Sequence, residues 1–296
     1  MFTKETVYIN GIKSISVDGV QPYSLSDTLE CGQCFRFERV SDSTLVSEYT
    51  GIAFGKHVRV GQDENGRLLF IGTPDEDFEK IWIKYFALDT SLNDVRAEIL
   101  KNAPKENKLH LAAEAAKGIA ILRQEPWEAL FSFIVSQNNN IPRIRKIIKT
   151  VCESYGKRVE GDLGYAFPSA EEIIARPEGL ESARVGFRLR YLLDAAKRVC
   201  EGETDLSVIQ NIGDYSAAKT ELMKITGVGS KVADCVLLYG MNYLSAFPID
   251  VWIRRAMGEY FTDTFTPESL GRYAGIAQQY IFHFARVLEK EGGGTK

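Results

Sequence analysis

Residues 222–235, LMKITGVGSKVADC, place two glycines between two segments with helical patterns. Gly227 and Gly229 can adopt positive φ angles and let backbone N–H groups come close to another molecule, and Ser230 can cap the helix that follows. Unpaired N–H groups at a helix N-terminus, together with the helix dipole, favour a bound phosphate. The stretch therefore predicts a helix, a hairpin and a second helix that bind an anion. A tight turn between two packed helices is the alternative that these glycines leave open.

A lysine and a carboxylate are predicted to meet beside this hairpin. The second helix should run from about Ser230 to Tyr239, with Gly240 as its terminator, and about ten further residues can return the chain to its start. Asp250, at the N-cap of the next helix, would then lie beside Lys231. Because the positive end of a helix dipole disfavours an ammonium group, a neutral, nucleophilic amine is one hypothesis for this lysine. A charged lysine that binds phosphate is the other.

Outward from the hairpin, the chain divides into a strand-rich beginning and a helical remainder. Roughly the first 70 residues alternate β-branched or aromatic runs with turn formers, which predicts antiparallel strands, and Asn65-Gly66 should form a two-residue turn with two positive φ angles. After Thr73, apolar residues recur at helical spacing, namely Phe78, Ile81, Trp82, Tyr85 and Phe86. We predict an α+β fold, with an antiparallel β domain at residues 1–115 packed on an all-α domain at residues 116–290.

Composition excludes several classes of protein. The 296-residue chain is 45% apolar, which is enough for a sizeable core. It has no apolar run of about 18 residues, and its opening MFTKETVYIN has no secretory signal pattern. With 36 basic and 40 acidic residues the net charge is −4, so any nucleic-acid-binding surface must be local. We expect a soluble, cytoplasmic monomer that does not associate with membranes.

The five cysteines are an odd number spread along the chain, which favours reduced thiols over a disulfide framework. Cys31 and Cys34 form one CxxC pair. A zinc site needs further ligands, and no second CxxC and no pair of histidines follows nearby. We therefore predict no metal and no other cofactor.

Several motifs resemble those of one enzyme family. GVGSKVADC at 227–235 and FPIDVW at 247–252 resemble the helix-hairpin-helix signature of the DNA glycosylase superfamily. CGQCFRF at 31–37, FSFIVSQNNNIPRI at 131–144 and YAGIAQQYIF at 273–282 narrow the resemblance to the 8-oxoguanine DNA glycosylase family. The resemblance implies a β domain similar to the TATA-binding protein, joined to a helical glycosylase domain.

The same resemblance implies an activity. The protein would flip 8-oxoguanine, paired with cytosine, out of duplex DNA, excise it and nick the strand, as a bifunctional glycosylase and abasic-site lyase in base excision repair. Lys231 would attack the sugar C1′ and form a Schiff base that permits β-elimination. Asp250 would stabilise positive charge at the sugar.

Five residues are implied to form the pocket for the base. Phe282 and Cys235 would sandwich the purine, Gln278 would bond its Watson–Crick edge, and Pro248 would line the pocket. Oxidation converts N7 of guanine from an acceptor into an N–H donor, so the carbonyl of Gly32 would favour the lesion and repel guanine.

Contacts with the remaining DNA are also implied. Asn138 would fill the space left by the flipped base, Phe187 would wedge into the stack, and Arg143 with Arg188 would bind the orphaned cytosine. A solvated charged face is the alternative for these arginines.

Three positions differ from eukaryotic members of the family. Trp252 stands where those members carry a phosphate-binding histidine, Phe187 where they carry tyrosine, and Cys34 where they carry serine. The departures indicate a prokaryotic member. Gly227, Gly229 and Trp252 complete the set of residues predicted to contact the DNA backbone.

Two other functions stay open. The chain could be a helix-hairpin-helix glycosylase for another damaged base, such as an alkylated purine, or a DNA-binding module without catalysis. Lys231, Gly32 and Gln278 argue against the first of these two functions.

Overall fold

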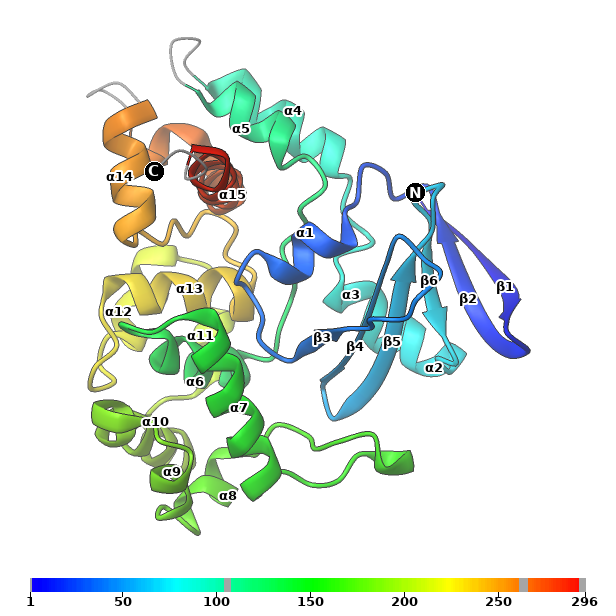
Figure 1. The fold of residues 1–296 in the computed structure, drawn as a ribbon. Helices are drawn as coiled ribbons and strands as arrows, with labels where there is room; N and C mark the ends of the chain where they lie inside the picture. Colours follow the sequence, from blue (N-terminus) through cyan, green and yellow to red (C-terminus); the bar gives the residue numbers. More distant parts are fainter. Residues whose placement is uncertain (1, 104–107, 261–265, 293–296) are drawn as a thin grey trace.

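The computed structural model describes residues 2–103, 108–260 and 266–292, and it has the predicted α+β fold. A six-stranded antiparallel sheet is followed by a mostly helical part (Figure 1). Its strands are β1 (Thr3–Ile9), β2 (Ile12–Asp18), β3 (Phe37–Arg39), β4 (Ser47–Ala53), β5 (Lys56–Gln62) and β6 (Leu68–Ile71), in the order β1-β2-β6-β5-β4-β3.

Helices build the rest of the chain, with η marking 3₁₀ or π turns. The first group is α1 (Leu25–Glu30), α2 (Asp75–Asp77), η1 (Phe78–Trp82), α3 (Ile83–Tyr85), α4 (Leu92–Asn102), α5 (Leu109–Ala115), α6 (Pro126–Ser136), α7 (Ile141–Tyr155), η2 (Glu160–Asp162) and α8 (Ala170–Ile174). The second group is α9 (Gly179–Ser182), η3 (Gly186–Arg188), α10 (Leu189–Cys200), α11 (Leu206–Gln210), α12 (Tyr215–Leu222), α13 (Ser230–Met241), α14 (Val251–Tyr260), η4 (Pro267–Tyr273) and α15 (Ala274–Gly292). Among the described residues, no helix combines the length and the apolar character needed to cross a membrane.

The turn between β5 and β6 differs from the predicted one. Of Asn65 and Gly66, only Gly66 has a positive φ angle, at 78°, so the prediction of two positive angles is wrong. The carbonyl of Asp63 accepts a hydrogen bond from Gly66 N–H at 3.0 Å, and its side chain accepts from the N–H groups of Asn65 and Arg67 at 3.0 and 2.9 Å. The aspartate side chain therefore stabilises a wider turn.

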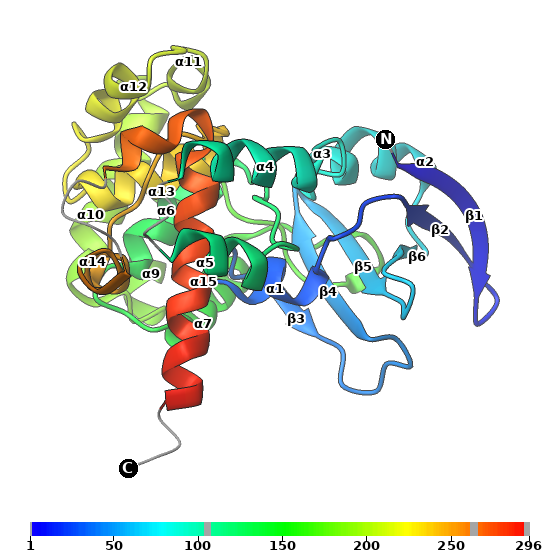
Figure 2. The same ribbon diagram turned by 90° about the horizontal axis from the view of Figure 1, so that it is seen from above.

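Two apolar cores lie on either side of the junction between the sheet and the helices. One core packs the sheet against the predicted apolar stripe, in which Phe78, Trp82, Tyr85 and Phe86 are buried. The other core is helical. Helices α4 and α5 pack against η4 and α15 in that second core, rather than on the sheet (Figure 2). The predicted division into two domains at residue 115 stays a prediction.

Helix α13 departs from its predicted ends. It continues through Gly240 to Met241, and Asn242, with φ 60°, is the left-handed residue that ends it. Gly229, not Ser230, is the N-cap, and no side chain caps the helix. Gly240 is a packing residue, because a Cβ there would lie 2.8 Å from Cβ of Ala129 on α6.

A buried ion pair joins the N-terminal segment to the helical part. The Arg36 guanidinium lies 3.2 Å from the carboxylate of Glu128 on α6, and the two side chains are only 8% and 10% exposed. Arg36 also donates to the carbonyl of Tyr165. Burial raises the pKa of Glu128 to about 7, although Arg36 opposes that shift.

This carboxyl should make stability depend on pH. Because the pKa of Glu128 in the folded state lies above its ordinary value of 4.5, the folded state binds the proton more tightly. The resulting stabilisation is present at low pH and is lost as the pH rises through about 7. We expect Glu128→Gln to remove this part of the decline, about 3 kcal/mol, from unfolding free energies measured in denaturant between pH 5 and 8. Glu76→Gln, at the surface, is the control, and identical profiles for wild type and Glu128→Gln would contradict the assignment.

Candidate active site

The two glycines of the hairpin between α12 and α13 lie in different surroundings. Gly227 has a positive φ angle and is tightly packed, whereas Gly229 has free space where a Cβ would be. Gly227 has φ 81°, and a Cβ there would lie 2.3 Å from the ring of Tyr191, so glycine is required by both backbone and packing. Gly229 has φ −91°, an ordinary value, which makes the predicted positive angle wrong at this position. A Cβ at Gly229 would meet nothing within 4 Å. This chain's own packing therefore does not explain why residue 229 is glycine.

Lys231 begins α13 and lies against α6. Its Nζ is 3.4 Å from the hydroxyl of Ser136 and 5.4 Å from the ring centroid of Phe133. The side chain is half-buried, and within the described ranges no carboxylate lies close enough to form an ion pair with it. The Lys231 amine thus contacts an aromatic ring and a hydroxyl, and it forms no ion pair with a carboxylate of the described residues.

Asp250 precedes α14 and caps it, as predicted. Its Oδ1 accepts a hydrogen bond from Ile253 N–H at 2.8 Å, and its carbonyl accepts from Arg254 N–H at 3.0 Å. One carboxylate oxygen is therefore fixed by the backbone. Asp250 and Lys231 line the same cavity, so the chain does return to the start of α13.

That cavity, of about 60 Å³, contains every residue predicted for the base pocket together with both predicted catalytic residues. Its lining comes from the CGQC turn, α6, α13, the segment before α14, and α15. The lining residues are Cys31, Gly32, Phe133, Lys231, Cys235, Tyr239, Pro248, Asp250, Gln278, Gln279 and Phe282. A larger cavity of about 380 Å³, between the sheet and α7, contains none of the predicted site residues.

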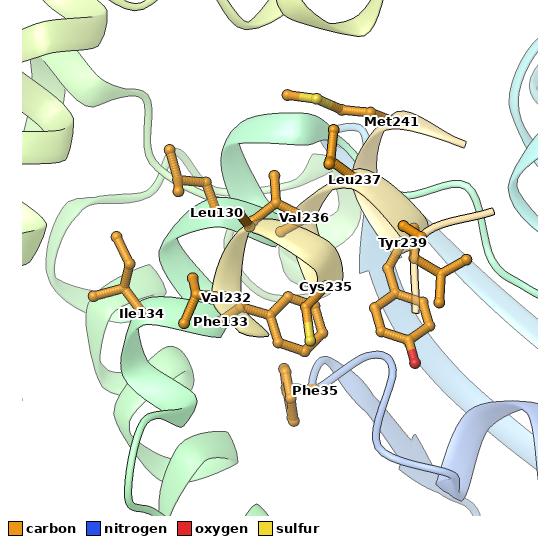
Figure 3. Packing of buried hydrophobic residues seen from close by; sticks show 14 of the residues in the cluster. Phe35, Leu130, Phe133, Ile134, Val232, Cys235, Val236, Leu237, Tyr239 and Met241 are labelled. Carbon is orange, nitrogen blue, oxygen red and sulfur yellow. The ribbon is translucent and has the colours of Figure 1, made fainter. Parts of the chain in front are cut away.

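The cavity has apolar walls. Phe133 stacks on Tyr239 with 5.3 Å between ring centroids and meets Phe35 edge-on at 5.8 Å (Figure 3). Cys235 points from α13 toward the same ring. Burial raises the pKa of the Cys235 thiol to about 11, so the thiol is neutral at pH 7 and serves as a wall.

Two residues that line the cavity have an acceptor without a partner among the described residues. Gln278 is 4% exposed, and its buried Oε1 receives no hydrogen bond from any described residue. Gly32 has φ 90°, and no described residue donates to its carbonyl. A buried acceptor without a donor, such as Oε1 of Gln278, is costly and is retained where a ligand completes its hydrogen bond.

Sequence reasoning missed four lining residues: Cys31, Phe133, Tyr239 and Gln279. Tyr239 follows Cys235 by four residues, a helical spacing that could have indicated it. Gln279 is adjacent to Gln278, and no spacing rule places two neighbouring helical side chains in one cavity. Contacts of that second glutamine with other elements bring it there.

A groove of about 1100 Å³ continues from the cavity. Among the predicted DNA contacts it includes Asn138, Gly229 and Trp252. Asn138 has φ 47°, a strained value for a residue other than glycine, and its side chain is exposed. Trp252 is 36% exposed and Val251 beside it 82%. Apolar side chains this exposed indicate a surface for another molecule.

Arg188 is placed differently from its predicted role. It is 2% exposed, and its guanidinium donates to the carbonyls of Gln137 and Asn138, each at 3.0 Å, and of Val185 at 3.2 Å. Burial, and then the charge of Arg143, lower the pKa of Arg188. In this arrangement Arg188 holds the loop that carries Asn138. Contact with a cytosine would require it to leave these carbonyls, whereas Arg143 is exposed.

Phe187 projects from the surface beside Arg188. Its side chain is 54% exposed, and the Arg188 guanidinium lies 4.4 Å from its ring centroid. The Tyr191 ring, which also packs on Gly227, meets it edge-on at 6.2 Å. The predicted wedge is therefore connected to the hairpin through one tyrosine.

Comparison with known proteins identifies the family. A model of the 8-oxoguanine DNA glycosylase N-terminal domain matches residues 17–130. A probable N-glycosylase/DNA lyase of Methanothermobacter thermautotrophicus is 30% identical over 226 residues, which cover 64% of this chain and 72% of that protein. The chain belongs to the 8-oxoguanine DNA glycosylase family.

Two further relatives are similar to this chain, one in sequence and one in sequence and fold. The N-glycosylase/DNA lyase of Saccharomyces cerevisiae is 32% identical over 255 residues, which cover 78% of this chain and 66% of the yeast protein. The 8-oxoguanine glycosylase/lyase of Clostridium acetobutylicum, crystallised with double-stranded DNA containing cytosine opposite 8-oxoG, matches with a TM-score of 0.85 and 34% identity. That match covers 97% of this chain and 98% of the clostridial one. The family resemblance and the fold class are confirmed.

No metal site emerges in this glycosylase: the described residues contain no group of three or more His, Cys, Asp or Glu side chains placed to hold an ion. Cys31 and Cys34 are both buried, and their thiols lie 3.3 and 3.7 Å from carbonyls of α1, those of Thr28 and Leu29. The CxxC pair packs at the end of that helix.

The two hairpin glycines should respond differently to alanine. Gly227→Ala forces a side chain into a positive φ and into Tyr191, so we expect a loss of about 1 to 3 kcal/mol in unfolding free energy. Gly229→Ala should change stability by less than about 0.5 kcal/mol but weaken DNA binding severalfold, because its Cβ would stand where a phosphate approaches. Thermal melts and fluorescence anisotropy with an 8-oxoguanine duplex measure both. Unchanged DNA affinity in Gly229→Ala would show that no phosphate comes close to this residue.

Proposed function

We propose that this N-glycosylase/DNA lyase excises 8-oxoguanine opposite cytosine, with Lys231 as nucleophile and Asp250 as electrostatic partner. The observation that carries the proposal is the shared cavity: the amine and the carboxylate open into the same space as Gly32, Gln278 and the apolar walls. Each lies at the N-terminus of a helix, where the backbone fixes its position. A DNA-binding module would have no need for an amine beside an unpaired, buried amide.

The acceptors in the cavity fit the lesion. The unpaired Oε1 of Gln278 can accept hydrogen bonds from the N1–H and exocyclic amine of the base. Those donors exist in guanine and in 8-oxoguanine alike. N7 differs, because it is an acceptor in guanine and carries a hydrogen in 8-oxoguanine. The Gly32 carbonyl would therefore bond the lesion and face a lone pair in guanine.

The proposed reaction uses the two residues at the helix N-termini, Lys231 on α13 and Asp250 before α14. The neutral amine of Lys231 bonds to C1′ as the N-glycosidic bond breaks, and the bonding electrons leave with the base, which is protonated. The carboxylate of Asp250 stabilises positive charge at the sugar. Loss of the amine proton and opening of the sugar ring at O4′ give a Schiff base. Removal of a proton from C2′ then expels the 3′ phosphate and nicks the strand.

The surrounding surface would hold the duplex. Phe187 is exposed for insertion into the base stack and Arg143 for contact with the orphaned cytosine. Gly229 and Ser230 of the hairpin are exposed, so their N–H groups would bind a phosphate. Arg188 would join Arg143 after leaving the carbonyls that it holds in this structure. We further propose that the protein acts as a monomer in base excision repair, in the cytoplasm of a prokaryotic host.

Lys231→Gln tests the chemistry. On a duplex with one 8-oxoguanine opposite cytosine, wild type should release the base, cleave the strand and give a covalent adduct when borohydride reduces the Schiff base. Lys231→Gln should lose cleavage and adduct while still binding the duplex, and Lys197→Gln, on an exposed part of α10, should behave as wild type. Cleavage by Lys231→Gln would contradict the assigned nucleophile. Release of alkylated purines instead of 8-oxoguanine would favour the alternative glycosylase, and binding without any base release a non-catalytic module.

Arg143→Ala tests the choice of opposite base. Loss of a bidentate contact with cytosine should reduce the excision preference for cytosine over adenine about tenfold, since such contacts supply about 1 to 3 kcal/mol of discrimination. Lys146→Ala, on the same exposed side of α7, also removes one positive charge. It should weaken binding to every duplex equally. Equal preference in wild type and Arg143→Ala would overturn this role.

A further inference from the structure

The turn that carries Gly32 is held from both sides by buried glutamines. We infer that Gln279 is a positioning residue for lesion discrimination, which keeps the Gly32 carbonyl from turning away from an undamaged guanine. The inference rests on the proposed function, because it concerns the same carbonyl and the same base. Gln279 need not touch the base to have this effect.

On one side of the turn, Gln279 connects three elements. Its side chain, on α15, is 1% exposed. The Tyr239 hydroxyl of α13 donates to its Oε1 at 2.6 Å, and its Nε2 donates to the Cys31 carbonyl at 3.4 Å. Because the Tyr239 hydroxyl is hydrogen-bonded to the amide oxygen of Gln279, the amide nitrogen of Gln279 points toward the turn. The peptide group that precedes Gly32 is thereby tied to the helical core.

On the other side, Gln33 is 0% exposed and fully engaged. Its Nε2 donates to the carbonyls of Thr28 and Ala120, each at 2.8 Å. The Gln33 carbonyl in turn accepts from Nε2 of Gln124 at 2.7 Å. Gly32 therefore lies between two residues whose positions are fixed by buried hydrogen bonds.

Rigidity of this turn is what makes the Gly32 carbonyl selective. A glycine at φ 90° has no side chain to restrict its peptide groups, and a Cβ there would approach only Ile141, at 3.4 Å. A carbonyl free to rotate would turn aside from the N7 lone pair of guanine and remove the repulsion. A fixed carbonyl keeps that repulsion, so the two bases are told apart only while the turn is held.

The experiment measures the ratio of dissociation constants for duplexes with guanine and with 8-oxoguanine opposite cytosine. Every variant carries Lys231→Gln, so no base is excised. Gln279→Met keeps the volume of the side chain and removes both hydrogen bonds, and we expect the ratio to fall about tenfold, mainly through tighter binding of guanine. Tyr239→Phe removes only the hydroxyl that orients the amide, and should lower the ratio about threefold.

A matched control separates positioning from stability. Gln62 is also buried, and it donates to the Tyr23 carbonyl at 2.6 Å and accepts from Leu25 N–H at 3.0 Å, within the β domain. Gln62→Met should lower the melting temperature as Gln279→Met does and leave the binding ratio unchanged. If Gln279→Met does not fold, Tyr239→Phe supplies the same test.

The outcomes distinguish the inference from the proposed function. A ratio unchanged within twofold in Gln279→Met or Tyr239→Phe, with the parent still preferring 8-oxoguanine, overturns the positioning role alone. A parent that does not prefer 8-oxoguanine overturns the proposed function, and the inference falls with it. A reduced ratio confined to the Gln279 and Tyr239 variants supports the inference.

Discussion

The close crossing of helices α13 and α6 is the contact on which the geometry of the site depends. A Cβ at Gly240 would lie 2.8 Å from Cβ of Ala129, so the two helices can approach only because residue 240 is glycine. The approach places Lys231, at the start of α13, against Ser136 and Phe133 near the end of α6. A larger residue at position 240, near the end of α13, would separate the helices and move the amine away from its cavity.

A second glycine, Gly275, lets α15 pack against the segment before α14. Helix α15 also carries a polar group, the side chain of Gln278, whose oxygen folding leaves unpaired. A Cβ at Gly275 would lie 2.4 Å from the Ala246 carbonyl, so the start of α15 packs directly on the segment that leads to Asp250. Gln278 follows on α15 and brings a buried, unpartnered oxygen into the space. Such a group lowers stability and is retained where a ligand completes the hydrogen bond. In this family member one such group, the Oε1 of Gln278, lies where the damaged base would bind.

Local signals predicted part of this site, and long-range contacts decided the rest. Asp250 was placed correctly because N-cap chemistry and chain reach are local properties, and Cys235 because four residues make one helical turn. Gly240 looked like a helix terminator, since nothing in its own segment shows that α6 lies against it. The burial of Arg188 depends on carbonyls about 50 residues earlier in the chain. Gln279 likewise acts through partners from two other elements, which no spacing in its own helix could indicate.

A crystal structure of Lys231→Gln bound to a duplex with one 8-oxoguanine opposite cytosine tests the placement of the base most directly. We expect the damaged base outside the duplex, between Cys235 and Phe282, with its N7 within hydrogen-bond distance of the Gly32 carbonyl. The sugar C1′ should face residue 231 and the carboxylate of Asp250. A lesion that stays stacked in the duplex while the hairpin holds the phosphates, or a flipped base outside this cavity, would contradict the assignment.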